Sequence, residues 1–296
     1  MANRRAEMKR RDPVRGFSGC PEGPVRFPFD MLRPLALALL VALAAAPAAA
    51  QKPVVADSAG PGGSASWPFA VGERMTFDGK FGWLPVGRAE VVIDAMDTVR
   101  GHETYRVRFS VNGGPAWFGV HDNYTSWFDS KTLVSYRYFQ DIHEGRYSRR
   151  STYEILPSQG IYTRNGKDTA LTVPAPLDDE SFLYFIRTVP LAVGDHYAWN
   201  RYFMADRNPV IVDVVREETI EVPAGKFRCY VLRPTIKTSG IFAEGGHAEV
   251  WISADEHRWI VQMKSGLSFG SLNLYLKSYT VGGAPVDSSA GRPRDR

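Results

Sequence analysis

Six histidines are the first residues to consider for metal binding or proton transfer. They are His102, His121, His143, His196, His247 and His257. No two of them share the short spacing that is typical of zinc or iron ligands. Two segments place carboxylates beside a histidine, HDNYTSWFD from His121 and DIHEG from Asp141, but both patterns are typical of surface turns. We therefore predict no metal site and no cofactor.

A second chemical motif is GLSFG at residues 266–270, which matches the G-x-S-x-G pattern of hydrolase nucleophiles. That motif requires a strand, a sharp turn and a helix, with an acid and a histidine later in the chain. Residues 271–276 instead alternate like a strand, and the last histidine, His257, precedes Ser268. We interpret GLSFG as a glycine-flanked β-turn or bulge. We name no catalytic residue, and a hydrolase is the least supported function.

Three consecutive acids, Asp178, Asp179 and Glu180, could provide carboxylates for acid–base chemistry. The same residue types are favoured at a helix N-terminus, where carboxylates accept hydrogen bonds from free backbone N–H groups. Helix capping explains the cluster more simply. We find no glycine-rich phosphate loop between a strand and a helix.

Aromatic residues make up 12% of the chain and are its most unusual feature. Many alternate along predicted strands, which is typical of a β-sheet core. The same residues could instead line an apolar cavity for a lipid, an acyl chain or a glycan. Trp and Tyr suit the mouth of such a cavity, because their rings are apolar and their tips polar. We predict four ligand-binding residues, in or beside the Gly/Pro-rich segments GWLPVG and NGGPAWFG: Trp83, Trp117, Phe118 and Trp127.

Residues 31–50, MLRPLALALLVALAAAPAAA, have the three parts of a signal peptide. Arg33 precedes an apolar run at 35–46, and Ala48-Ala49-Ala50 supplies the small residues of a cleavage site. The run is shorter than the about 20 apolar residues of a membrane-spanning helix. We predict cleavage after Ala50, a periplasmic location and no transmembrane span in the mature chain. Residues 1–30 are an upstream extension or a long n-region, so the true start could be Met1 or Met31.

Removal of this leader changes the charge and the cysteine count. Residues 1–50 hold eight of the 36 basic and four of the 32 acidic residues, so the net charge of +4 falls to zero. We therefore predict no nucleic-acid partner, because such proteins present a basic surface. Only Cys229 of the two cysteines remains, which excludes an intramolecular disulfide. Its alternating apolar neighbours predict a buried, unreactive thiol.

The elements that must position these residues are mostly short β-strands. Apolar and polar residues alternate over 105–111, which predicts a strand with one buried face. Similar runs predict strands at 74–81, 87–96, 123–128, 133–142, 146–156, 160–165, 196–204, 209–221, 226–237, 248–253, 259–265 and 271–280. The pair Asn165-Gly166 is a strong signal for a hairpin turn.

One segment, PLDDESFLYFIRTVPL at residues 176–191, has a helical period instead. Pro190 would end this helix. Its apolar face would contain Phe182, Phe185, Ile186 and Val189. Further apolar neighbours widen that face, so the helix must be covered on several sides. We therefore predict a mainly β fold, in which a curved antiparallel sheet, half-barrel or barrel-like, wraps one short apolar helix.

With these segments in view, the chain resembles the domain of unknown function 3108 family of exported bacterial proteins. The matching stretches are VGERMTFDGKFGWLPVGRAEVVI, DNYTSWFD with YRYFQ, LDDESFLYFIRTVPLAVGD, EVPAGKFRCYVL and AEVWISADEHRWIVQMKSGLSFGSLNLYL. The resemblance implies a periplasmic or surface-facing location in a Gram-negative cell, and it brings no established activity. The wrapped helix is also similar to half-barrels of the lipoprotein-carrier type, although fold alone does not determine function.

These observations predict a single β-rich domain at 67–281, after a flexible lead-in at 51–66 and before a disordered tail at 282–296. We predict that it is not an enzyme but binds or chaperones an apolar or amphipathic cell-envelope component, such as a lipid or an acyl chain. The alternative is an envelope structural or protein-interaction module with a packed interior, an envelope protein as partner and no small ligand.

Overall fold

The computed structural model describes residues 67–283, apart from 115–118, 237–247 and 268–269. These residues form fourteen strands in one sheet. The strands are β1 Arg74–Phe81, β2 Leu84–Val99, β3 His102–Gly113, β4 Val120–Asp129, β5 Ser135–Glu144, β6 Tyr147–Leu156, β7 Ile161–Arg164, β8 Asp168–Leu171, β9 His196–Trp199, β10 Val210–Val222, β11 Gly225–Thr235, β12 Glu249–Ser253, β13 Ile260–Leu267 and β14 Gly270–Thr280.

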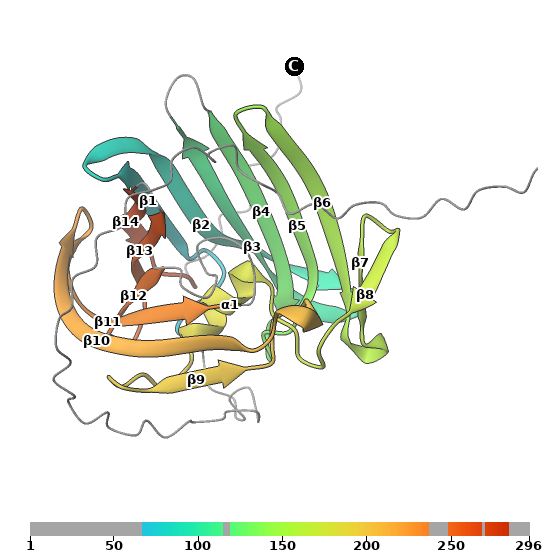
Figure 1. Ribbon diagram of the computed structural model, residues 1–296. Coiled ribbons are helices and arrows are strands. Elements are labelled where there is room, and N and C mark those ends of the chain that lie inside the picture. The colour runs from blue at the N-terminus through green and yellow to red at the C-terminus, as the bar shows by residue number, and fades with distance from the viewer. Residues whose placement is uncertain (1–66, 115–118, 237–247, 268–269, 284–296) are drawn as a thin grey trace, which may run out of the picture. The chain divides into compact units, whose positions relative to one another are not determined.

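The sheet is antiparallel, and neighbouring strands in the sheet are consecutive in the chain except at one long-range pairing. From one edge to the other the order is β8 to β1, then β14 to β9. The junction pairs β1 with β14, which brings the first and last strands together. The edge strands β8 and β9 do not pair with each other, so the sheet does not close into a barrel. Figure 1 shows it curving round the helix α1, which confirms the predicted fold class.

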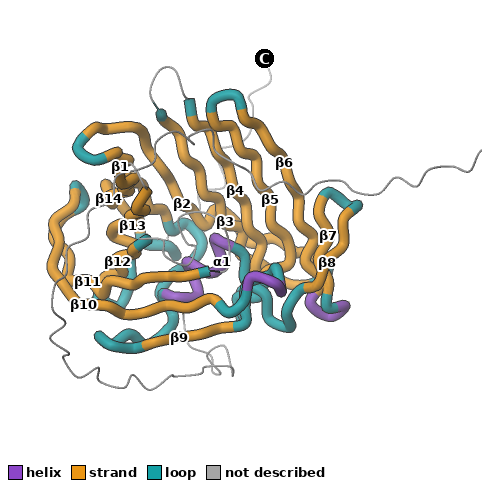
Figure 2. The backbone as a smooth tube through the Cα atoms, viewed as in Figure 1, coloured by secondary structure: helices purple, strands orange, loops and turns teal. Residues whose placement is uncertain are grey.

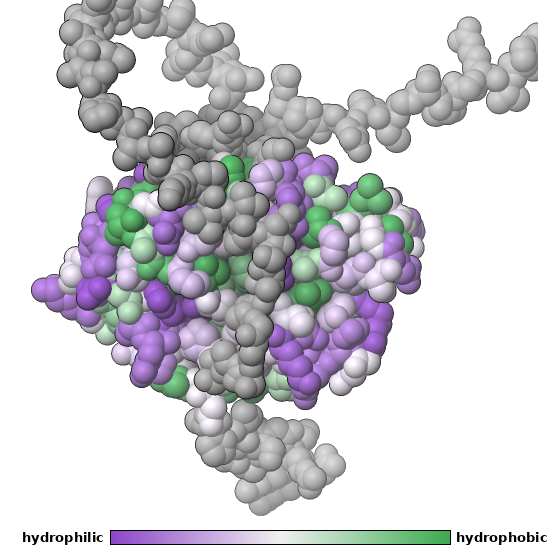
Figure 3. All heavy atoms as spheres, turned by 90° about the horizontal axis from the view of Figure 1, so that it is seen from below, coloured by the Kyte–Doolittle hydropathy of each residue, from purple (hydrophilic) through white to green (hydrophobic). Residues whose placement is uncertain are grey.

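Alternation along each strand separates a buried concave face from a charged convex face. In β1, Met75 and Phe77 are fully buried, whereas the exposed Arg74 pairs with Glu90 at 2.6 Å. Arg106 on β3 likewise pairs with Asp94 at 2.8 Å. Oppositely charged neighbours therefore cover the convex face, as expected for a face in water. On the side seen in Figure 3, polar and apolar residues are interspersed.

The helix α1, Asp179–Ile186, lies against β4 on the concave side (Figure 2). Asp178 is its N-cap and accepts a hydrogen bond from the backbone N–H of Ser181 at 2.9 Å. Phe182, Phe185 and Ile186 are buried as predicted. Val189, predicted on the same helical face, lies beyond the C-cap residue Arg187.

Two strands differ from the prediction. The exposed residues DTAL form β8, which the apolar pattern missed, although the turn before it was predicted. That turn places Asn165 and Gly166 at positive φ of 54° and 68°. The strand predicted at 196–204 ends at Trp199, where its pairing with β10 ends. Beyond it, Tyr202 bridges to Leu177, and its backbone N–H donates to the side chain of Asn208 at 2.8 Å.

Short helical elements complete the described part of the chain. Two 3₁₀ helices occupy Pro157–Gln159 and Ala205–Arg207. Within residues 67–283, excluding the three gaps, no helix has the length and apolar character needed to span a membrane.

Candidate ligand-binding site

The helix covers only part of the concave face. Its eight residues extend about 12 Å at 1.5 Å per residue, whereas the twelve residues of β3 extend about 40 Å at 3.3 Å per residue. Val107 on β3 is fully buried, but Phe109 and Val111 on the same face are only partly buried. We call the partly buried apolar residues beyond the helix the uncovered concave surface: Phe109, Val111, Tyr124 and Ile142.

Three neighbouring strands supply this surface, and their register brings the residues together. Val111 pairs with Asp122 and Phe109 with Tyr124 across β3 and β4. The rings of Phe109 and Tyr124 are stacked, with centroids 5.8 Å apart. The hydroxyl of Tyr124 donates to Asp122 at 3.4 Å. The surface is therefore apolar and aromatic, with polar groups at its margin.

The N-terminal turn of α1 places its first acid, Asp178, in a fully satisfied position. Ser126 on β4 donates its hydroxyl to Asp178 Oδ2 at 2.6 Å, and the Ser181 N–H donates to Oδ1. Burial raises the pKa of Asp178 to about 6. This residue acts as a helix cap, which is the role that the sequence predicts.

The second acid, Asp179, is held by two strand and loop tyrosines. The Tyr138 and Tyr202 hydroxyls each donate to one oxygen of its carboxylate at 3.0 Å. Protein atoms surround this carboxylate and raise its pKa by desolvation, yet the residue remains exposed to solvent. The carboxylate of Asp179 is therefore fixed in orientation, on a residue that is exposed as a whole.

The third acid, Glu180, has an unsatisfied oxygen. The residue is 4% exposed, and its Oε2 has no hydrogen-bond partner. Burial and the charges of Asp178 and Asp179 raise its pKa well above the usual range. Among the residues that the structure describes, no lysine, arginine or histidine forms an ion pair with these three acids. A helix cap does not explain this arrangement of Asp179 and Glu180.

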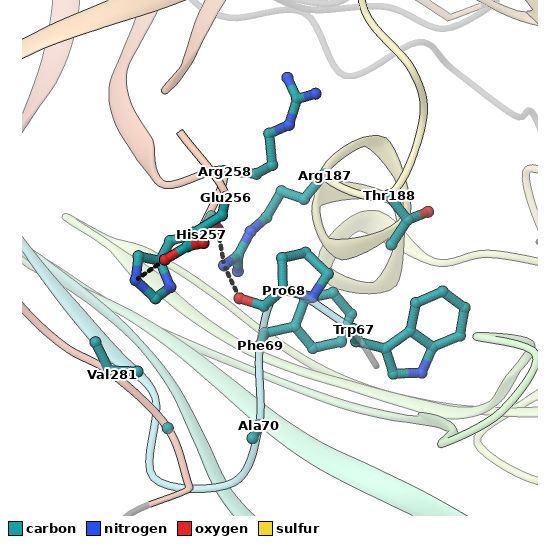
Figure 4. A pocket seen from close by; sticks show the side chains of 11 residues that line it. Trp67, Pro68, Phe69, Ala70, Arg187, Thr188, Glu256, His257, Arg258 and Val281 are labelled. Atoms are coloured by element: carbon teal, nitrogen blue, oxygen red, sulfur yellow. Dashed lines mark hydrogen bonds and ion pairs between the residues drawn. The ribbon is translucent and has the colours of Figure 1, made fainter. Parts of the chain in front are cut away.

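A pocket of about 560 Å³ lies at the other end of α1 (Figure 4). Arg187 projects toward it but is already neutralised. Its Nη1 and Nη2 donate to the two oxygens of Glu73 at 2.6 and 2.8 Å. The rings of Phe69, Tyr184 and Trp259 surround the guanidinium at 5.0–5.7 Å. This pair joins the helix to the start of β1 and is not a free anion site.

Of the four residues predicted to bind ligand, the structure describes Trp83 and Trp127. Trp83 lies at the β1–β2 turn and is 87% exposed. Trp127 alternates with the buried Ser126 and Phe128, so it faces the convex side, where its Nε1 donates to Asp97 at 2.8 Å. Trp117 and Phe118 lie outside the described residues, so their role stays a prediction.

Two other sequence interpretations have structural counterparts. Cys229 is buried, as predicted, and burial raises its thiol pKa to about 12.

In GLSFG, Leu267 ends β13 and pairs with Gly270, the first residue of β14. A strand rather than a helix therefore follows the motif, unlike a nucleophile elbow. Ser268 lies outside the described residues. Across the described ranges, no three His, Cys, Asp or Glu residues are grouped to hold a metal ion.

Comparison with known proteins places the chain among proteins without an assigned activity. A family model described as protein of unknown function, DUF3108, matches residues 75–277. No curated protein matches the chain. A β-barrel-like protein of domain of unknown function DUF1849 from Brucella abortus is 11% identical, with a TM-score of 0.48, over 72% of this chain and 98% of that chain.

Two further solved structures are similar at lower scores. They are a candidate lipoprotein from Parabacteroides distasonis, 10% identical, and a candidate exported protein with a YmcC-like fold from Bacteroides fragilis, 9% identical. Each has a TM-score of 0.32 and covers 72% of this chain and 98% of its own. Likeness at this level does not extend to function.

Proposed function

This chain belongs to the DUF3108 family of proteins of unknown function, so its function must be inferred from its own structure. We propose that it binds the acyl chain of an amphipathic cell-envelope component. One observation supports the proposal: α1 leaves part of the concave face uncovered. Phe109, Val111 and Tyr124 remain partly exposed there, while Val107 and Phe128 beside the helix are fully buried. The leader at 31–50 would deliver the protein to the envelope.

An acyl chain suits this surface for a simple physical reason. Covering apolar surface contributes roughly 25 cal/mol per Å², and the protein's own helix is too short to do so. An open, antiparallel sheet also allows a flexible chain to enter from the side. The convex face suits an acyl chain less well, since ion pairs such as Arg106–Asp94 lie on it.

The test compares two variants with the same added charge on opposite faces of β3. Val111→Asp places a carboxylate on the uncovered concave surface, and Asn112→Asp places one on the exposed convex side. Protein purified gently from the envelope is extracted, and its lipid is measured by mass spectrometry. We expect bound lipid in the wild type and in Asn112→Asp, with at least about tenfold less in Val111→Asp.

Two results would overturn this function. One is the absence of lipid from the wild-type extract, together with no change in thermal stability when decanol, a fatty acid or a lysophospholipid is added. The other is equal lipid content in both variants. Circular dichroism of each variant separates loss of binding from loss of folding.

A second candidate function is protein interaction through a sheet edge. All four residues of β8 are exposed, and Leu171 is 70% exposed. An edge strand has unpaired backbone groups that can accept a strand from a partner. If this function holds, Leu171→Asp should reduce chemical cross-linking to a specific envelope protein, with lipid content unchanged.

A further inference from the structure

We propose that Asp179 and Glu180 form a binding site for an organic ammonium group, the head group of the amphipathic ligand. This inference rests on the proposed function, because the acyl chain of the same ligand would follow the uncovered concave surface. It adds the chemical class of the head group, which the apolar surface alone does not specify.

The unpartnered oxygen of Glu180 is the first observation. The side chain is 4% exposed, so its Oε2 can obtain few hydrogen bonds from bulk water. Tyr138 and a backbone N–H act on this carboxyl as donors, yet Oε2 itself has no partner. A buried carboxylate oxygen without a donor is costly, and proteins normally pair such groups. Glu180 therefore either holds a proton or receives a cationic donor from outside the chain.

Asp179 provides the second carboxylate and lies next to solvent. It follows Asp178 and precedes Glu180 in the first turn of α1, and it remains solvent-exposed. Each of its oxygens accepts one tyrosine hydroxyl, from Tyr138 and Tyr202 at 3.0 Å. A carboxylate oxygen has further acceptor capacity, so the carboxylate is oriented but not saturated.

Charged and titratable groups round Glu180 make the site acidic. Asp178 at the N-cap, Asp179 in the helix and Tyr138 on β5 act on Glu180 directly. On β4, Tyr124 is influenced by Glu180 and also by Asp122 and by Glu144 of β5. Two arginines act on this group of side chains without an ion pair to Asp179 or Glu180. Arg149 donates to Gln140 at 2.8 Å, which in turn donates to the Tyr138 hydroxyl at 3.1 Å, and Arg207 acts on Asp179 and Tyr202 only over a distance.

An ammonium group fits these acceptors better than a metal ion does. Its N–H donors can bond to Glu180 Oε2 and to the oxygens of Asp179 in charge-assisted hydrogen bonds. A metal ion would need several converging ligands, and the described residues provide no group of three.

Tyr124 connects this site to the apolar surface. Tyr124 lies on β4, the strand that α1 contacts. Burial raises the pKa of its phenol most, and Asp122, Glu180 and Asp179 add to that rise. Its ring stacks on Phe109. A ligand with its ammonium group at Glu180 can therefore place its chain directly on the uncovered concave surface.

The experiment uses three ligands with the same ten-carbon chain and different head groups: decylamine, decanol and decanoate. Their affinities are measured by isothermal titration calorimetry at pH 8, below the pKa of an alkylammonium at about 10.4. We expect wild-type protein to bind decylamine about tenfold more tightly than decanol, because hydrogen bonds to charged groups are stronger than neutral ones. Decanoate should bind more weakly than decanol.

The variant Glu180→Gln removes the charge at nearly constant volume. It should lose the preference for decylamine over decanol while its affinity for decanol stays within about twofold. The matched control is Glu256→Gln, an 89% exposed carboxylate at the other end of the helix, which should keep the wild-type preference. The wild-type preference itself needs no variant, so the proposal stays testable if Glu180→Gln does not fold.

The outcomes separate the two proposals. Binding of decanol without any preference for decylamine would overturn the ammonium site and leave the acyl-binding function intact. Failure of all three ligands to bind would overturn both. An unchanged preference in folded Glu180→Gln would also reject the ammonium site at this position.

Discussion

The buried pair of Arg187 and Glu73 determines how the end of the helix meets the sheet. The two residues are 114 positions apart, and their side chains are at most 1% exposed. Arg187 also donates to the carbonyl of His257 at 3.0 Å, so three segments meet at one guanidinium. In Figure 4 the neighbouring Arg258 points away from this contact. Each charge depends on the other, because neither can reach water.

Removal of one partner should therefore be strongly destabilising. We predict that Glu73→Gln lowers the free energy of unfolding by roughly 3–5 kcal/mol, since it leaves the guanidinium buried without a counter-charge. Urea denaturation measures the change. The matched control is Glu90→Gln, whose partner Arg74 is exposed, and its cost should stay below about 1 kcal/mol. Equal losses in the two variants would contradict the prediction.

Asp178 should make the fold less stable as the pH rises. Burial raises its pKa from 3.8 to about 6 in the folded chain. Between about pH 4 and 6 the folded state thus binds more protons than the unfolded state, and the free energy of unfolding falls with increasing pH. The stabilising contribution is present below pH 4 and lost above pH 6. Two pKa units correspond to about 3 kcal/mol.

The variant Asp178→Asn tests this effect, because asparagine keeps an oxygen acceptor for the Ser181 N–H and cannot ionise. Relative to wild type, its unfolding free energy should increase between pH 4 and 6 and then remain constant. The comparison with wild type cancels the pH-dependent contributions of other carboxyls, such as Glu249. A hydrogen bond from Arg216 lowers the pKa of Glu249, so this residue stabilises the fold more as the pH rises. A difference that does not vary with pH would contradict a raised pKa at Asp178.

At the scale of elements, α1 is held mainly by aromatic packing. Phe185 is 5% exposed, and its ring meets Trp199 of β9 edge-on at 5.2 Å. Phe182 contacts the same tryptophan at 6.3 Å. The helix thus bridges β4 on one side and β9 on the other, although these strands lie far apart in the sheet order.

Truncation of Phe185 should destabilise the packing of the helix against the sheet. We predict that Phe185→Ala lowers the free energy of unfolding by about 3–5 kcal/mol, the usual cost of a buried phenylalanine, with a sharp fall in the thermal midpoint. Leu183→Ala in the same helix is the control, because Leu183 is only partly buried and should cost less. A midpoint for Phe185→Ala within error of wild type would place the helix outside the core.

At the scale of the whole molecule, the described sheet begins after the predicted leader. The indole N–H of Trp67 donates to the carbonyl of Ser130 at 2.6 Å, so described contacts start at residue 67. We predict that the exported protein begins at Gln51, because Ala48 and Ala50 form the small-residue cleavage pattern. N-terminal sequencing and intact mass of periplasmic protein check this start. A chain retained in the cytoplasm with residues 31–50 present would contradict it.

The sequence by itself determined the local elements. Alternation over 74–81 and 105–111 predicted strands, the Asn165-Gly166 pair predicted its turn, and the period of Phe182, Phe185 and Ile186 predicted the helix. These patterns depend on neighbours within about ten residues, where side-chain direction follows directly from backbone geometry. The strand β8 escaped prediction, because all four of its residues are exposed and only its pairing with β7 defines it.

Only the tertiary structure decided which residues share a site. Strand periodicity does not say which face is concave, so it gave no way to place Trp127 on the convex side. The pairing of Glu73 with Arg187, and of Tyr138 and Tyr202 with Asp179, depends on a register between distant segments. The acids at 178–180 looked like a helix cap, and for Asp178 that was correct. The unpartnered oxygen of Glu180 arises because the sheet folds round the helix N-terminus and brings tyrosines and further acids there, but no paired cation.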